Sequence, residues 1–170
     1  INVWRPMNKF ILSDNEIDSS MIKKIGGKAQ GLMALQKAGY SVPFFAVIPT
    51  DIFQELFQKT LQSTWGALVE ELLGMTMSAE VAAQIMETKI SQLDLQVLKD
   101  EVDGFLAKHV GVTSWAVRSS LNDEDGSTNS FAGQMSSFLF QKTSSDIAEA
   151  IRNVYKSGFS KRAIAYRMNR

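Results

Sequence analysis

The chain of 170 residues has no cysteine and a single histidine, and these two shortages exclude several classes of site. Without cysteine there is no disulfide, zinc–thiolate site, iron–sulfur cluster or thiol nucleophile. His109 alone cannot build a site of several histidines, and it is the one candidate base for a Ser–His triad. It follows Lys108 at the expected end of a helix, where a cationic side chain offsets the helix dipole, so we expect a structural role.

Neither sign of charge is in excess, because 18 Lys and Arg stand against 18 Asp and Glu. A chain without a net field does not steer polyanions, so nucleic-acid binding through bulk charge is disfavoured and only a local patch is left open. No apolar run approaches the ~20 residues that cross a bilayer, and the start lacks the basic and then apolar segment of a secretion signal. We expect a cytoplasmic protein with neither a nucleic acid nor a membrane as partner.

The residues that are present suit a folded domain, since 45% are hydrophobic and 21% are charged. A chain of this length buries roughly 70% of its unfolded surface, which fits one domain or one lobe of a larger fold. The chain begins at Ile1 without an initiator Met, and it ends at Arg170 within an expected helix that has no stop signal. We therefore expect it to be part of a longer polypeptide.

The spacing of apolar residues predicts helices interleaved with short strands. Gly39 is expected to stop a first helix, Val42-Pro43 forces extended chain, and Thr50 is the expected N-cap of the next helix. Helices are predicted over 28–38, 50–61, 65–74, 78–90, 92–108, 144–155 (capped by Ser144 or Ser145) and from 160 onward; strands are predicted over 10–12, 44–48, 114–119 and 135–140. This order predicts an α+β fold with a small mixed sheet flanked by helices.

A first candidate for chemistry is Ile25-Gly26-Gly27-Lys28. Two glycines let the backbone bend and approach another group closely, and the amide N–H groups at the start of the following helix favour an anion, as does the Lys28 charge. The segment is neither a Walker A loop, because Ala29 follows the lysine, nor a dinucleotide fingerprint. Alone, this motif favours a Gly-Gly turn with a solvated lysine over phosphate binding.

A second candidate is Ala116-Val117-Arg118-Ser119-Ser120, which is followed by an acidic loop and by Ser130-Phe131-Ala132-Gly133-Gln134. An arginine near a strand end can present a fixed fork of donors to phosphate oxygens, and Gly133 permits close backbone approach. In the alternative interpretation, Arg118 pairs internally with Asp123 or Asp125. This motif alone slightly favours that alternative.

The case for phosphate binding is stronger when the two motifs are considered together with further sequence blocks that stand with them in a fixed order. In chain order the blocks are Ile25-Gly26-Gly27-Lys28, Gly39-Tyr40-Ser41-Val42-Pro43, Ala116-Val117-Arg118-Ser119-Ser120, Glu124-Asp125, Ser130-Phe131-Ala132-Gly133-Gln134 and Arg162-Ala163-Ile164-Ala165-Tyr166-Arg167. This order resembles the N-terminal nucleotide-binding domain of the phosphoenolpyruvate synthase / pyruvate phosphate dikinase family, which also occurs in rifampin phosphotransferases and plant water dikinases. The resemblance covers about residues 22–170, with a divergent stretch between 55 and 110.

The resemblance implies an ATP-grasp-like fold in which ATP lies between two lobes, with this chain as the first lobe. By motif match, Lys28 and Arg118 would hold the ATP phosphates and serve catalysis, Gly133 would line the site through its backbone, and Ser137 stands where the family often has Thr. Such enzymes use ATP to phosphorylate a carrier histidine on a mobile domain. The second lobe, the carboxylates that bind Mg²⁺ and the carrier histidine would lie beyond residue 170, so we expect no metal ligands within this chain and no activity of the chain alone.

Departures from the family pattern leave the phosphate-binding residue types in place. Phe44-Phe45 replaces the usual Pro-Gly, and Met135 replaces a frequent Gln. Two alternatives stay open: a nucleotide-sensing or scaffold domain that lacks the relay, and an unrelated helical domain in which several ordered blocks coincide by chance. The sequence does not identify the phosphate acceptor, which could be pyruvate, a drug hydroxyl, a glucan or another group.

Overall fold

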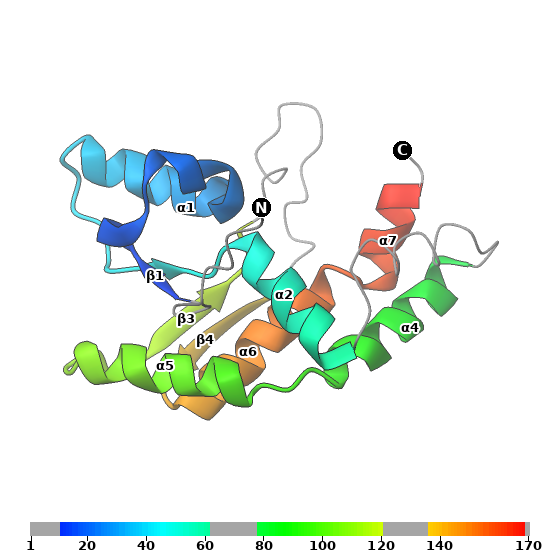
Figure 1. The fold of residues 1–170 in the computed structure, drawn as a ribbon. Helices are drawn as coiled ribbons and strands as arrows, with labels where there is room; N and C mark the ends of the chain where they lie inside the picture. The colour runs from blue at the N-terminus through cyan, green and yellow to red at the C-terminus, as the bar shows by residue number, and fades with distance from the viewer. Residues whose placement is uncertain (1–10, 62–77, 121–135, 169–170) are drawn as a thin grey trace, which may run out of the picture.

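A computed structural model of the chain describes residues 11–61, 78–120 and 136–168 (Figure 1). The helices are α1 (Ile22–Lys37), α2 (Thr50–Leu61), α4 (Ala79–Ser91), α5 (Gln96–Lys108), α6 (Ser144–Ser157) and α7 (Lys161–Met168), with short 3-10 helices at Asp14–Glu16 and Ser19–Met21. The strands are β1 (Leu12–Ser13), β2 (Ala46–Val47), β3 (Trp115–Arg118) and β4 (Ser137–Gln141). The helix predicted over 65–74 lies outside the described residues.

The described strands form two separate antiparallel pairs, β1 with β2 and β3 with β4. The α+β class is confirmed, but the single mixed sheet was wrong. Because β1 and β2 have two residues each, their pair offers too short an edge to extend into a larger sheet. In the second pair Val117 lies opposite Phe138 and Arg118 opposite Ser137, beyond an irregularity between Trp115 and Val117.

Local sequence signals set the ends of several helices. Gly39 adopts a φ of +84°; its N–H donates to the Gln36 carbonyl, and the Tyr40 N–H donates to the Leu35 carbonyl. These two bonds form a Schellman motif, so the predicted stop is confirmed. A helix was predicted from residue 78, and α4 begins one residue later. Ser78 caps it by accepting a hydrogen bond from the Val81 N–H.

Two predicted caps were wrong by one residue. Thr50 is the first residue of α2 rather than the residue before it. The cap of α6 is Thr143, whose hydroxyl accepts from the Asp146 N–H at 3.0 Å, while the Asp146 carboxylate accepts from the Thr143 N–H at 3.1 Å. This reciprocal pair is a capping box, and it places Ser144 inside the helix, where it is buried.

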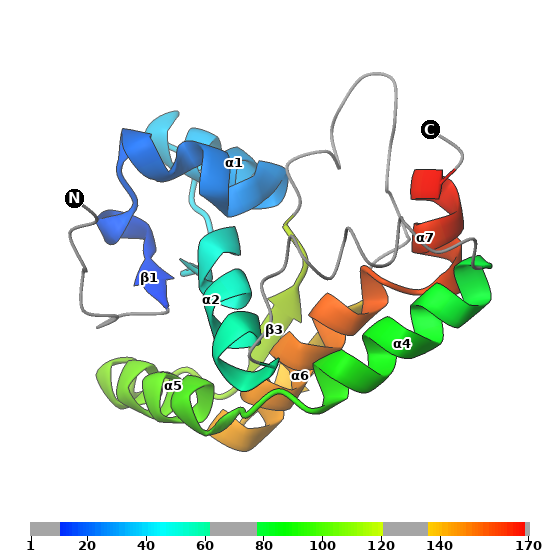
Figure 2. The same ribbon diagram turned by 45° about the vertical axis from the view of Figure 1, so that its right-hand side comes forward.

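Three apolar clusters hold these elements together. One joins α5, α6 and β3 around Val102 and Ile151, and a second joins α2 and α4 around Phe57 and Met86. Figures 1 and 2 show α4 lying along α6, with α7 beside the first turns of α4. The third cluster contains Ile25 and places the start of α1 against β1 and β2. Within the described ranges, no helix is long and apolar enough to span a membrane.

Candidate functional site

The start of α1 is interrupted at Gly26, whose φ of 71° and ψ of 166° are not helical. A side chain could not replace this glycine, because a Cβ built there would lie 1.8 Å from the Ser120 carbonyl oxygen. The close approach expected of the Gly-Gly motif is therefore confirmed. The group that approaches is the protein's own Ser120, two residues beyond the end of β3.

The Ser120 hydroxyl bridges the interruption in α1. It donates a hydrogen bond to the Ile25 carbonyl at 2.8 Å and accepts one from the Ala29 N–H at 3.1 Å. In an uninterrupted helix the N–H of residue 29 would donate directly to the carbonyl of residue 25. Ser120 thus caps the segment that follows Gly26, which has no side chain with which to cap it.

This bridge joins the two motifs that the sequence presented as separate candidates. Ser120 is two residues beyond Arg118, a span of at most about 7 Å along the chain, and its two partners flank Lys28 in sequence. Lys28 is half-buried on the turn that Ser120 caps. Because the Ala29 N–H is already bonded, it is not open to an anion, which corrects part of the expectation for this helix start.

Arg118 and Ser137 are opposite each other where β3 ends and β4 begins. Residues directly opposite in an antiparallel pair present their side chains on the same face, and both side chains are exposed. Arg118 and Ser137 are therefore neighbours through strand pairing, and Ser120 links the end of β3 to the turn that carries Lys28. We call this region, with three of the four predicted site residues, the Ser120 junction. Gly133 lies outside the described residues, as do Asp123 and Asp125.

Some other cations of the described residues stand beside carboxylates. Lys24 pairs with Asp51 at 2.6 Å, and Lys161 pairs with Glu80 at 2.8 Å. The hydrogen bond and charge of Lys161 hold the pKa of the Glu80 carboxyl below its ordinary value. Arg118, by contrast, has no carboxylate partner in the part of the chain that the structure describes.

His109 lies in an aromatic cluster at the end of α5. Its Nδ1 is 2.7 Å from the Phe105 carbonyl oxygen, and its ring packs on Phe44 and Phe105 with centroid distances of 4.3 Å and 4.4 Å. Its predicted place at a helix end is confirmed. Over residues 11–61, 78–120 and 136–168, no three His, Cys, Asp or Glu side chains gather as a metal site would require.

Ser120 is the linking residue that sequence reasoning missed, although it stood within a motif. The available signal was a glycine at the start of a helical segment, because such a segment needs a hydrogen-bond acceptor that the glycine cannot supply. The sequence does not indicate which residue supplies it, since the two partners of Ser120 lie 91 and 95 residues away.

Comparison with known proteins places the chain in a family. A family model described as the pyruvate phosphate dikinase AMP/ATP-binding domain matches residues 22–170. A probable phosphoenolpyruvate synthase of Methanothermobacter thermautotrophicus is 31% identical over 95% of this chain and 25% of its own length. The phosphoenolpyruvate synthase of Escherichia coli is 30% identical over 94% and 21%, and a rifampicin phosphotransferase of a Streptomyces species is 28% identical over 94% and 19%.

The chain therefore spans a quarter or less of the length of these relatives. The matched segment begins at Ile22, the first residue of α1, and includes both motifs that Ser120 joins. The match to the family model and these relatives confirm the resemblance found in the sequence. The chain belongs to the family of the pyruvate phosphate dikinase AMP/ATP-binding domain.

Proposed function

We propose that this chain forms one side of an ATP site in which Lys28 and Arg118 bind the triphosphate. The observation that carries the proposal is the Ser120 bridge, because it brings the two cationic motifs to one junction. Membership of an AMP/ATP-binding family supports the choice of ligand. The exposed Arg118, without a carboxylate partner among the described residues, is suited to bind an anionic ligand.

Each residue has a distinct role in this proposal. The Arg118 guanidinium offers a planar fork of donors to two phosphate oxygens, whereas the Lys28 ammonium supplies a point charge on a flexible stem. The Ser137 hydroxyl, opposite Arg118, donates one further hydrogen bond, and Gly133 lets backbone approach the ligand. Charge that develops on the phosphoryl oxygens during transfer is stabilised by such fixed positive groups.

The proposal extends to the intact protein as a phosphotransferase. Names of relatives, phosphoenolpyruvate synthase and rifampicin phosphotransferase, support a phosphotransferase. The carrier histidine that receives the phosphoryl group from ATP is the part of the proposal that only the resemblance of the motifs implies. A second lobe of an ATP-grasp-like fold, with the Mg²⁺ ligands, would come from elsewhere in the polypeptide. The chain alone should bind ATP weakly and transfer nothing, because a site that lacks one side buries too little of the ligand.

The test measures ATP affinity of the intact protein by calorimetry, with Lys28→Ala and Arg118→Ala. Each variant should bind ATP about 10- to 100-fold more weakly, since each loses a hydrogen bond to a charged group. Lys37→Ala at the other end of α1 and Arg162→Ala on α7 are matched controls, because both are exposed cations outside the junction. Wild-type affinity in both site variants would contradict the proposal.

The transfer step is tested separately with radiolabelled ATP. Acid-labile, base-stable label on the intact protein, reduced in both site variants, supports the histidine relay. ATP binding without any such label would instead favour a nucleotide-sensing or scaffold domain, the second function that the sequence left open.

A further inference from the structure

The two hydrogen bonds of Ser120 take the place of one helical hydrogen bond in α1. The hydroxyl stands between the Ile25 carbonyl and the Ala29 N–H, which would bond to each other only if the helix were continuous at Gly26. We propose that Ser120 is a positioning residue of the nucleotide site: its hydroxyl fixes the turn that carries Lys28 against the end of β3, where Arg118 stands. This inference rests on the proposed function of Lys28.

The chemistry of the junction requires a hydroxyl. A carbonyl needs a donor and an N–H needs an acceptor, and Ser and Thr supply both from one atom. Ile25 and Ala29 are 1% and 5% exposed, so water does not readily replace a lost partner. An alanine at position 120 would leave both backbone groups without their present partner, which is unfavourable in a buried setting.

The interruption at Gly26 makes Lys28 dependent on this link. A continuous helix would bond residue 29 directly to residue 25 and would leave the end of β3 unconnected to that turn. Instead, the turn is held on one side by the apolar cluster that contains Ile25 and on the other by the Ser120 hydroxyl. Since Lys28 directly precedes Ala29, movement of this turn moves the base of its side chain.

A double-mutant cycle in the intact protein tests the inference, with ATP dissociation constants as the readout. Ser120→Ala should weaken ATP binding about tenfold, the factor that one to two net hydrogen bonds supply. In a Lys28→Ala background the same substitution should change affinity less than about twofold, because its effect passes through Lys28. Additive losses, or wild-type affinity of Ser120→Ala, would overturn the inference.

Two further variants keep the test valid if Ser120→Ala folds poorly. Ser120→Thr retains the hydroxyl and should bind ATP within about threefold of wild type, whereas Ser120→Cys forms weaker hydrogen bonds and should fall between Ser and Ala. Equal affinity of the Cys variant and wild type would also overturn the inference.

Ser157→Ala is the matched control. The Ser157 hydroxyl accepts from the Ser136 N–H at 3.0 Å and donates to the Val154 carbonyl at 2.6 Å, the same pattern of one backbone donor and one backbone acceptor. It should leave ATP affinity unchanged. If Lys28→Ala itself binds ATP normally, the proposed function fails; if Lys28→Ala is impaired and Ser120→Ala is not, the positioning role alone fails.

Discussion

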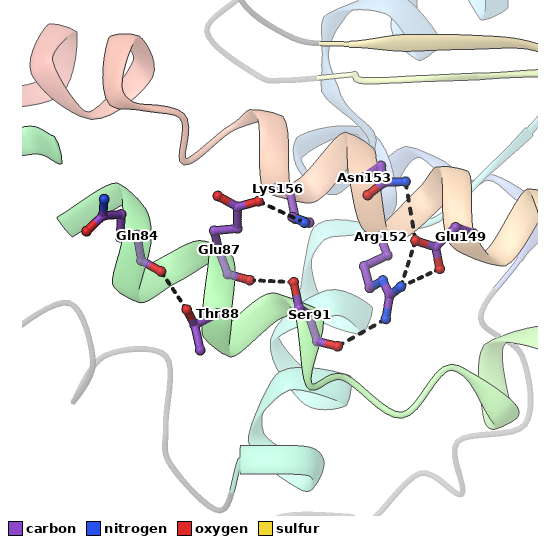
Figure 3. A network of polar contacts seen from close by, with 8 residues as sticks. All are labelled: Gln84, Glu87, Thr88, Ser91, Glu149, Arg152, Asn153 and Lys156. Atoms are coloured by element: carbon purple, nitrogen blue, oxygen red, sulfur yellow. Dashed lines mark hydrogen bonds and ion pairs between the residues drawn. The ribbon is translucent and has the colours of Figure 1, made fainter. Parts of the chain in front are cut away.

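Among the polar contacts that join distant segments of the described residues, two junctions use charge in opposite ways. Between α4 and α6, Arg152 donates to the Ser91 carbonyl at 3.1 Å and pairs with Glu149, while Lys156 pairs with Glu87 at 3.2 Å (Figure 3). Every cation drawn there has a carboxylate beside it. At the start of α1, a neutral hydroxyl forms the link between segments, and the nearby Arg118 has no carboxylate partner among the described residues.

The difference separates cations that stabilise the fold from cations that are suited to a ligand. A cation neutralised by a neighbouring carboxylate has little field left for an external anion, whereas one held near a neutral link keeps it. The α4–α6 junction is therefore structural, whereas the Ser120 junction combines a structural link with the two cations that we propose bind a nucleotide. The following predictions change one junction at a time.

Gly26→Ala should have the largest effect. The new Cβ would lie 1.8 Å from a backbone oxygen, at a φ of +71° that side chains rarely adopt, so the free energy of unfolding should fall by about 3 kcal/mol or more. Gly31→Ala in the same helix has open space around it and should instead raise that free energy by up to about 1 kcal/mol. Denaturant unfolding measures both, and similar values for the two variants would contradict the close approach.

Arg152→Ala should separate stability from binding. Loss of its stem packing and its bond to the Ser91 carbonyl should lower the free energy of unfolding by about 1–2 kcal/mol and leave ATP affinity unchanged. Arg118→Ala should show the reverse, with unfolding within about 0.5 kcal/mol of wild type and weaker ATP binding. A loss of ATP affinity in Arg152→Ala would remove the distinction between the junctions.

Thr143→Val compares a local cap with the remote cap supplied by Ser120. Removing the hydroxyl should lower the free energy of unfolding by about 1 kcal/mol without changing ATP affinity. Hydrogen bonds from the Thr143 side chain and backbone hold the pKa of Asp146 below its ordinary value. The associated stability is fully present above about pH 4 and is lost as pH falls through the lowered pKa.

In the Thr143→Val variant the pKa of Asp146 should therefore rise toward its ordinary value, which NMR titration measures directly. Thr88→Val is a suitable control, because its hydroxyl bonds only to the Gln84 carbonyl among the contacts drawn for it and lies away from α6's first turn. An unchanged Asp146 pKa in Thr143→Val would show that the capping box does not control this carboxyl.

The sequence predicted what depends on neighbouring residues and missed what depends on distant ones. The stop at Gly39 follows from backbone freedom at a single residue, and it was predicted. The division into two sheets was not predictable, because apolar alternation does not specify which strand pairs with which. The Ser120 bridge was missed because its two partners lie 91 and 95 residues away along the chain.

The candidate site shows the same division. The residue types that suit phosphate were evident at Lys28 and Arg118, and the family resemblance implied that both belong to one ATP site. Neither motif alone favoured phosphate binding over a structural role, because the first also fits a turn and the second also fits an internal ion pair. The structure adds the opposition of Arg118 and Ser137 and the link from Ser120 to the turn of Lys28, both of which depend on tertiary contacts.

The central claim is that Lys28 and Arg118 act on the same triphosphate, and a comparison of AMP, ADP and ATP affinities in the intact protein tests it most directly. Wild type should bind ATP more tightly than AMP, while Lys28→Ala and Arg118→Ala should lose most of that preference and bind AMP nearly as wild type does. An ATP-over-AMP preference that survives in both variants would contradict the claim.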